Sequence, residues 1–299
     1  MKLISDGEKN LKNPILSILI VTHNSEQYVE DCIKSLTSQK IPRNEYEIIV
    51  IDDGSKDNSV ELSKKAGADL VIETDPCSIG KARNIGFENS KGNFIGIIDS
   101  DCRANEGWIR AIISELQSHH AISGPVINGN VQSKISWAEY FLEFAYFNDK
   151  KKKSRIRFMP GCNGAFSKEV FLKVGGYTDI RASEDVLFGD SLKRVGIDIY
   201  FIPEMSLEHF GRTTLPKLKN NLELLGRYFV RNRRKAPTLN YPYIINHKLF
   251  VISVFFFKII IGVKFAIQAK KSLKFLLAFP YIILGVFSYC RGFLKEMNE

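Results

Sequence analysis

Short apolar runs alternate with helix-like stretches along the first 100 residues of the chain. Apolar residues recur at helical spacing over residues 29–36, which predicts a helix there. A second helix is predicted to end near Ala66, and a third is predicted over Ile79–Asn89. The apolar runs are short and rich in β-branched residues, which predicts strands over Ile15–Val21, Glu47–Ile51, Asp69–Ile72 and Asn93–Ile98. Strands that alternate with helices indicate a parallel sheet with helices on both faces.

The pattern loosens beyond residue 120, where elements of uneven length are expected. Aromatic residues are frequent in one predicted helix, and basic residues are frequent in the last one. The strand-like segments are Ile122–Val131 and Ile197–Ile202, while Phe158–Phe166 is expected to form a strand and a loop. The predicted helices are Trp137–Phe147, Ser183–Arg194 and Lys217–Lys235.

Polar and acidic residues gather at the carboxyl ends of three predicted strands. These clusters are Thr22-His23-Asn24-Ser25, Asp52-Asp53-Gly54-Ser55 and Asp99-Ser100-Asp101. In open parallel sheets, ligands bind at this edge. Asp, Asn, Gly and Ser also form turns, which is the alternative interpretation of any one cluster. Three successive clusters at the same edge favour a binding site.

Asp99 and Asp101 lie two residues apart directly after a strand. Two carboxylates at this spacing can approach one hard divalent cation, directly or through water. Mg²⁺ or Mn²⁺ in such a position would bridge a diphosphate and neutralise charge on a departing nucleotide.

Two other groups suit a nucleotide. A carboxylate at Asp53 can accept hydrogen bonds from a base or ribose, while Gly54 allows a sharp turn. Lys81, Arg83 and Asn84 lie early in a predicted helix, where a phosphate would meet positive side chains and a helix N-terminus. The alternatives are an Asp-Gly turn and a solvated basic face.

These motifs, taken in order, resemble the family 2 glycosyltransferases of GT-A fold. The agreement covers residues 15–120 and extends more weakly to about residue 210. It rests on Leu16-Ser17-Ile18-Leu19-Ile20-Val21-Thr22-His23-Asn24, Ile49-Val50-Ile51-Asp52-Asp53-Gly54-Ser55, Gly80-Lys81-Ala82-Arg83-Asn84 and Asp99-Ser100-Asp101. The resemblance implies an α/β fold of the GT-A nucleotide-diphospho-sugar transferase type, which is a Rossmann-like mixed sheet, followed here by a C-terminal hydrophobic helical tail.

The resemblance also implies roles for individual positions. Those expected at the nucleotide are Thr22, Asn24, Glu26, Asp53, Arg83 and Asp99, with Asp101 and Asp99 at the metal. His209 would complete the metal shell as in some GT-A enzymes, although a lone histidine near a strand is more often structural. Asn163 and Gly161 are candidates for contact with the sugar or acceptor.

Ser183-Glu184-Asp185 resembles the Glu-Asp motif of the family. Members of this kind invert the anomeric centre by direct displacement, which makes Asp185 the expected general base and Glu184 its catalytic neighbour. A carboxylate suits this role if partial burial raises its pKa. The alternative is that both acids only complement the positive end of a helix capped by Ser183.

The C-terminal tail contains two apolar segments, Leu249–Val263 and Phe275–Cys290. The sixteen residues of the second would span about 24 Å as a helix, short of the ~30 Å hydrocarbon core. Basic residues flank both segments and the loop between them, which the positive-inside rule disfavours for a two-pass hairpin. We therefore expect in-plane or re-entrant helices on an anionic membrane surface. A two-pass hairpin and a soluble helical pair packed on the catalytic domain, or on a second subunit in a homodimer, remain alternatives.

Composition narrows the choice of partner. The 299 residues carry a net charge of +9, which favours phosphate-bearing or anionic partners. The basic residues cluster with apolar helices and line no aromatic platform, which argues against nucleic acid. Five cysteines without metal or redox spacing indicate reduced thiols in a cytosolic setting, and Met1–Pro14 has no signal-peptide core.

The sequence therefore predicts a metal-dependent, inverting glycosyltransferase at the cytoplasmic face of a membrane. Leu224 stands where processive members have the Gln of Gln-x-x-Arg-Trp, which favours transfer of one sugar, from a nucleoside-diphosphate sugar to a lipid-linked or cell-envelope glycan acceptor. The alternatives are a non-catalytic membrane-bound scaffold that binds sugar nucleotides and a sugar nucleotidyltransferase. The predicted domains are an N-terminal extension (1–14), a catalytic domain (15–215), a basic helical connector (216–247) and membrane-associating helices (248–299).

Overall fold

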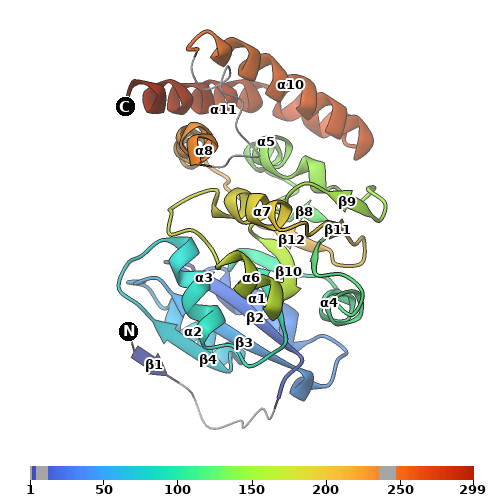
Figure 1. The fold of residues 1–299 in the computed structure, drawn as a ribbon. Helices are drawn as coiled ribbons and strands as arrows, with labels where there is room; N and C mark the ends of the chain where they lie inside the picture. Colours follow the sequence, from blue (N-terminus) through green and yellow to red (C-terminus); the bar gives the residue numbers. More distant parts are fainter. Residues whose placement is uncertain (1, 5–12, 236–246) are drawn as a thin grey trace. The chain divides into compact units, whose positions relative to one another are not determined.

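The computed structural model describes residues 2–4, 13–235 and 247–299 (Figure 1). The chain forms two compact units, each built from separate segments. The first comprises residues 1–125 and 152–208, and the second comprises residues 126–151 and 209–299. The functional domains predicted from the sequence divide the chain differently, and they stay a prediction.

The first unit is built on a nine-stranded mixed sheet in the order β1-β4-β3-β2-β5-β10-β7-β11-β9. The neighbours β4-β3-β2-β5 are parallel, as predicted for the first part of the chain. Strand β10 runs antiparallel between β5 and β7, and β1 and β9 are antiparallel edge strands. The strand bounds are Lys2–Ile4 (β1), Leu16–Thr22 (β2), Tyr46–Asp52 (β3), Leu70–Glu73 (β4), Phe94–Ile98 (β5), Ala121–Ser123 (β7), Ser154–Ile156 (β9), Asn163–Ser167 (β10) and Ile199–Phe201 (β11).

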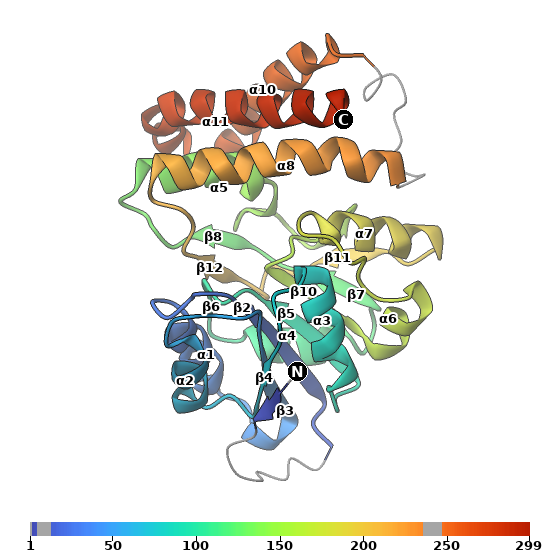
Figure 2. The same ribbon diagram turned by 90° about the vertical axis from the view of Figure 1, so that its left-hand side faces the viewer.

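Helices cover both faces of this sheet, with α1 and α2 on one side and α3 on the other (Figure 2). Helix α3 lies close to β2 and β3 because Gly86 has no side chain. A Cβ at this position would lie 2.6 Å from Ile51 Cδ1. The remaining elements of the unit are α1 (Val29–Thr37), η1 (Arg43–Glu45), α2 (Ser59–Ala66), α3 (Ile79–Glu88), β6 (Cys102–Ala104), α4 (Trp108–Glu115), α6 (Lys168–Val174) and α7 (Glu184–Arg194).

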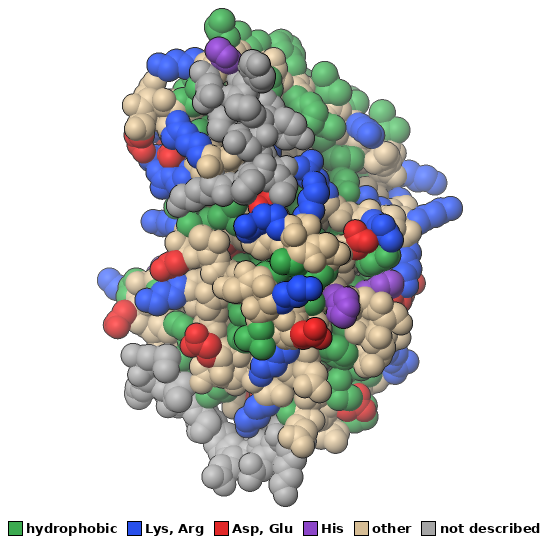
Figure 3. All heavy atoms as spheres, in the orientation of Figure 1, with side chains coloured by type: hydrophobic (Ala, Val, Ile, Leu, Met, Phe, Trp, Pro, Cys, Tyr) green, Lys and Arg blue, Asp and Glu red, His purple; other side chains and the backbone are tan. Residues whose placement is uncertain are grey.

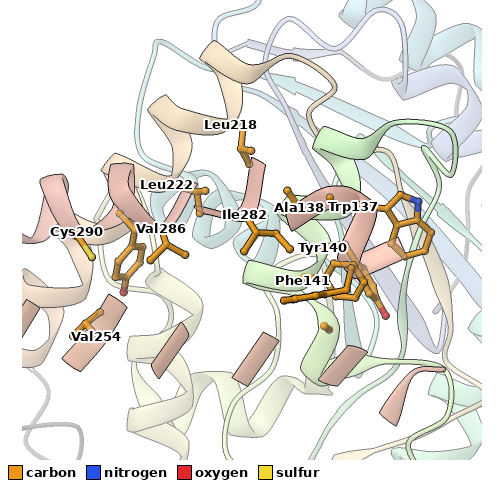
Figure 4. Close-up of a cluster of buried hydrophobic side chains, with 14 of the residues drawn as sticks. Trp137, Ala138, Tyr140, Phe141, Leu218, Leu222, Val254, Ile282, Val286 and Cys290 are labelled. Atoms are coloured by element: carbon orange, nitrogen blue, oxygen red, sulfur yellow. The ribbon is translucent and has the colours of Figure 1, made fainter. Parts of the chain in front are cut away.

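The second unit is mainly helical and has its own core. Side chains from four helices meet there, including Tyr140, Leu222, Val254 and Ile282 (Figure 4). Its elements are β8 (Val126–Asn128), α5 (Lys134–Glu143), η2 (Ala145–Phe147), α8 (Leu215–Lys235), α10 (Phe250–Gln268) and α11 (Ser272–Asn298), while β12 (Leu207–His209) marks the point where the chain enters this unit.

Helices α8 and α11 touch backbone to backbone through two glycines. A Cβ on Gly226 would lie 2.0 Å from the carbonyl oxygen of Tyr289, and one on Gly292 would lie 1.9 Å from that of Glu223. No side chain fits at either position, so this close approach of the two helices requires glycine at both.

Helices α10 and α11 are apolar on their outer surfaces. Both are long and apolar enough to cross a membrane by length and composition, with mean hydropathies of 2.3 and 1.8. Figure 3 shows hydrophobic side chains gathered over α10, and only 17% of its apolar window is buried in the protein. The helices are longer than the apolar segments predicted from the sequence, since α10 has 19 residues and α11 has 27. At 1.5 Å per residue, even α10 extends about 28 Å, so length does not exclude a crossing.

Two other predicted elements differ from the structure. The predicted strand Ile122–Val131 is split into β7 and β8 by Gly124 and Pro125. Gly124 approaches the backbone of Met205, where a Cβ would lie 1.9 Å from its carbonyl oxygen, and Pro125 has no N–H to donate. The predicted helix Trp137–Phe147 begins earlier and ends at Glu143, and a short 3₁₀ helix follows it.

Candidate active site

The strand register brings the predicted polar clusters to one edge of the sheet. Thr22 pairs with Asp52 across β2 and β3, and Leu19 pairs with Ile97 across β2 and β5. Because β10 runs the other way, its first residue, Asn163, pairs with Ile98 at the end of β5. The segments that follow β2, β3 and β5 and the segment that precedes β10 therefore meet at this edge of the sheet.

Hydrogen bonds tie the loops after β2, β3 and β5 to one another. The Asp53 N–H donates to the Thr22 carbonyl over 2.9 Å, and the Asn24 N–H donates to Ser55 Oγ over 2.8 Å. Ser100 Oγ donates to Ser25 Oγ over 3.0 Å. The three clusters recognised in the sequence thus form one connected rim.

The residues predicted at the nucleotide line this rim. Asn24 adopts a left-handed conformation, with φ of 49°, and its Oδ1 accepts from the Lys56 N–H. Glu26 accepts from the Asn58 backbone and side chain at 3.2 and 3.1 Å. Asp53 Oδ1 accepts from the Cys77 N–H at 2.5 Å.

Two buried oxygen atoms at this edge lack hydrogen-bond partners among the residues that the structure describes. They are Thr22 Oγ1 and Asp52 Oδ1, and these two residues are 1% and 2% exposed. Buried polar atoms in native proteins are nearly always paired, often with water or a ligand. Asp52 was not among the predicted site residues, although it belongs to the cluster that the sequence singled out.

Arg83 connects several parts of the site. Its guanidinium is 1% exposed and donates to Glu184 Oε1, to Asp99 Oδ1 at 3.1 Å and to the Gly161 carbonyl at 2.8 Å. It also lies over the ring of Tyr177, 5.2 Å from the centroid. The Arg83 side chain is therefore enclosed by acidic groups, a carbonyl and an aromatic ring.

Asp185 lies in the first turn of α7 beside the Gly161 loop. Its Oδ2 accepts from the Gly161 N–H at 2.9 Å, and its Oδ1 accepts from its neighbour Val186 at 2.8 Å. A side chain at Gly161 would be crowded, because a Cβ would lie 3.2 Å from Arg83 Nη2. The alternative interpretation required Ser183 to cap this helix, but Ser183 makes no side-chain capping bond and has φ of 57°.

Burial controls the ionisation of the acidic pair. It raises the pKa of Glu184 to about 7 and also raises the pKa of Asp185, while the nearby Arg83 opposes both shifts. A raised carboxylate pKa is a property of groups that accept a proton during a reaction.

The contacts form a continuous series from Asp53 to Asp185. Asp53 bonds to the β2 loop, which bonds to the loop after β5, where Asp99 bonds to Arg83. Arg83 in turn bonds to the carbonyl of Gly161, whose N–H bonds to Asp185. Acids that are far apart in the sequence therefore belong to one connected rim.

The chemistry of Asp99 and Asp101 fits a hard cation. Carboxylate oxygens are the donors that Mg²⁺ and Mn²⁺ prefer, and these two come from one loop at the sheet edge. The Asp99 side chain is 30% exposed, and Cys102 Sγ lies 3.8 Å from Asp101 Oδ1.

Two predicted site residues are buried. Asn163 is 0% exposed, and its amide donates to the carbonyls of Pro125 and Met205 and accepts from Trp108 Nε1, all within 3.0 Å. His209 is 8% exposed, belongs to the second unit and lies 4.6 Å from the Phe144 ring. Neither set of partners could be found from the sequence, because they lie tens of residues away.

Comparisons with known proteins agree with this architecture. The profile of glycosyl transferase family 2 matches residues 17–175, more than half of the chain. The glycosyltransferase AglE of Haloferax volcanii is 29% identical over 127 residues, which are 40% of this chain and 40% of AglE. The poly(ribitol-phosphate) beta-N-acetylglucosaminyltransferase TarS of Staphylococcus aureus is 30% identical over 110 residues, which are 35% of this chain and 19% of TarS. The matches span less than half the length of these two relatives.

A solved structure extends the likeness to nearly the whole chain. The mannosyltransferase PcManGT from Pyrobaculum calidifontis, determined with GDP-Man and Mn²⁺, superposes with a TM-score of 0.64 at 15% identity. The alignment covers 95% of this chain and 87% of that one. At this identity the likeness concerns the fold, and it confirms the predicted GT-A type α/β fold.

Proposed function

Because the chain belongs to glycosyl transferase family 2, we propose that it moves a single sugar from a nucleoside-diphosphate sugar to an acceptor hydroxyl, with inversion at the anomeric carbon. The observation that carries this proposal is the bonded series from Asp53 through Asp99 and Arg83 to Asp185. It supports a donor site and a base on one rim. The absence of a Gln at Leu224 supports transfer of one sugar.

The donor nucleotide would lie over the loops after β2 and β3. Asp53 would accept from its base or ribose, and Thr22, Asn24 and Glu26 would line its pocket. Within the described part of the chain, the oxygens Thr22 Oγ1 and Asp52 Oδ1 have no partner, which supports a polar ligand or water at this edge. We assign Arg83 a positioning role in place of the direct diphosphate contact implied by the resemblance, because its guanidinium is buried.

Asp99 and Asp101 would hold the divalent cation, and His209 as a further ligand stays a prediction. Mn²⁺ in the PcManGT structure supports a metal, without distinguishing it from Mg²⁺. When bound, such a cation supplies positive charge to the diphosphate leaving group.

Asp185 would act as the general base. Glu184 would help to position the residues around it through its ion pair with Arg83. The acceptor hydroxyl gives its proton to the Asp185 carboxylate while its oxygen bonds to C1 of the sugar. The bond between C1 and the diphosphate oxygen breaks on the opposite face, and the nucleoside diphosphate leaves with that electron pair. Direct displacement of this kind inverts C1.

The apolar helices and the relatives together suggest the acceptor. TarS is named for a poly(ribitol-phosphate) substrate, and α10 and α11 are apolar enough to enter a membrane. A lipid-linked or cell-envelope glycan acceptor at the cytoplasmic face of the membrane fits both observations. The anionic surface would be met by lysines such as Lys264 and Lys270.

Vesicle sedimentation tests the membrane assignment. The purified chain should pellet with vesicles that contain phosphatidylglycerol, and it should pellet less with neutral vesicles, because Lys and Arg flank the apolar helices. Equal recovery in the supernatant with and without vesicles would contradict membrane association.

Release of nucleoside diphosphate tests the activity and its metal. A panel of UDP- and GDP-sugars should include a donor whose turnover needs Mg²⁺ or Mn²⁺. Chelation should slow it by about 100-fold or more, because such an ion supplies several kcal/mol of charge stabilisation. A scaffold would bind donor without release, and a nucleotidyltransferase would release pyrophosphate from a nucleoside triphosphate. Either result would overturn the proposal.

A further inference from the structure

A groove of about 620 Å³ lies between the first half of α10 and the second half of α11. Its volume falls within the range of small-molecule sites, about 300–1,000 Å³. Its walls include Ile252 and Phe255 of α10 and Phe287 and Leu294 of α11, and Arg291 and Lys295 also line it. The groove belongs wholly to the second unit and is separate from the rim described above.

The wall of the groove is apolar and open to solvent. The rings of Phe255 and Phe287 lie 5.0 Å apart, while Phe287 is 59% exposed and Ile252 is 54% exposed. Exposed apolar surface of this kind marks a site of contact with a partner, a ligand or a membrane. An apolar wall between two helices suits a hydrocarbon chain.

A surplus of positive charge accompanies the apolar wall. Arg291 and Lys295 stand four residues apart on α11, and both pair with the same carboxylate, Glu223. The Arg291 Nε lies 3.5 Å from Glu223 Oε2, and the Arg291 side chain remains 67% exposed. Two cations that share one carboxylate leave one positive charge available, and an exposed guanidinium is well suited to phosphate oxygens.

We propose that this groove binds a single-chain lipid phosphate, with its hydrocarbon chain against Phe255 and Phe287 and its phosphate against Arg291 and Lys295. The single groove favours one chain over the two of a diacyl phospholipid. This inference rests on the proposed function in one respect, because it identifies the acceptor as a sugar carrier built on such a lipid phosphate. Lipid binding itself can be measured without turnover.

Calorimetric titration of the full chain with farnesyl phosphate tests the groove. Farnesyl phosphate should bind at least tenfold more tightly than farnesol, and inorganic phosphate alone should not bind measurably. Phe287→Asp should weaken farnesyl phosphate at least tenfold. Leu276→Asp is the matched control, because Leu276 is 67% exposed on the same helix and does not line the groove.

The charged residues have their own test. Arg291→Gln combined with Lys295→Gln should remove the preference for farnesyl phosphate over farnesol, whereas Lys264→Gln, at an exposed lysine of α10, should keep it. Equal loss in Phe287→Asp and Leu276→Asp would show general insertion into an apolar phase and would overturn the proposal. Full displacement of farnesyl phosphate by phosphatidylglycerol vesicles would also overturn it, in favour of bilayer lipid.

Failure of the groove and failure of the enzyme are distinguishable. Asp185→Asn should bind farnesyl phosphate like the unaltered chain, because Asp185 belongs to the first unit. Sugar transfer without farnesyl phosphate binding would overturn the groove and leave the proposed activity standing. Binding of farnesyl phosphate without sugar transfer to any acceptor would overturn the proposed activity and leave the groove standing.

Discussion

Asp185→Asn is expected to lower the rate of sugar transfer by about 10²–10⁴-fold, the usual contribution of a general base. The asparagine has the same shape and can still accept from the Gly161 N–H through its Oδ1, so the loop should keep its place. Donor affinity should change little, because the carboxylate acts on the acceptor. Single-turnover transfer and calorimetric titration of the donor measure these two quantities separately.

The control for this variant is Asp198→Asn. Asp198 precedes β11, which runs parallel to β7, so it lies at the opposite edge of the sheet. Its side chain is 52% exposed and pairs with Arg155. The control should transfer sugar at the unaltered rate. Activity of Asp185→Asn within a factor of two of the control would rule out the assigned base.

The pH profile gives a second readout of the same group. Asp185 accepts a proton only when ionised, so the rate should fall as the pH falls through its pKa. Burial raises that pKa above the ordinary aspartate value, which moves the acidic limb toward neutrality. Because Glu184 lies beside it and also titrates, the observed midpoint belongs to the pair. The residual activity of Asp185→Asn should lack the limb assigned to this base.

Arg83→Met is expected to lower the free energy of unfolding by about 3–5 kcal/mol, the typical cost of removing one partner from a buried ion pair. The side chains of Arg83 and Glu184 are 1% and 6% exposed, so the variant would leave Glu184 buried without its cation. It would also remove the bonds from Arg83 to the Gly161 carbonyl and to Asp99. Urea unfolding measures the loss.

Two further variants isolate the cause. Adding Glu184→Gln to Arg83→Met should recover part of the lost stability, because the uncompensated charge disappears. Arg155→Met removes an exposed pair with Asp198 and should change the free energy of unfolding by about 1 kcal/mol or less. A cost for Arg83→Met no larger than that of Arg155→Met would mean that Arg83 does not hold the site together.

The sequence predicted the edge of the sheet where the site lies because local patterns decide it. The strands β2, β3, β4 and β5 lie within one or two residues of their predicted bounds, since short β-branched runs end at polar clusters. Thr22 ends a strand, and Asp53 and Asp99 follow strands that are its neighbours in the sheet, so their placement required only the parallel order.

What the sequence could not predict depends on contacts between distant residues. Arg83 and Glu184 are 101 positions apart, and Gly161 and Asp185 are 24 apart. No spacing rule links such pairs, so Arg83 was expected at the diphosphate and found buried among acids. Asn163 was a candidate for contact with the sugar or acceptor, but its amide bonds to Trp108, Pro125 and Met205, which lie 38 to 55 positions away.

The interrupted course of the chain through the second unit limits how the protein can be shortened. Helix α5 comes from the middle of the sequence, yet Trp137, Tyr140 and Phe141 are covered by the helices at its end. A chain cut before residue 248 would present those aromatic rings to water. The C-terminal helices are therefore no detachable anchor, since they complete a core begun more than 100 residues earlier.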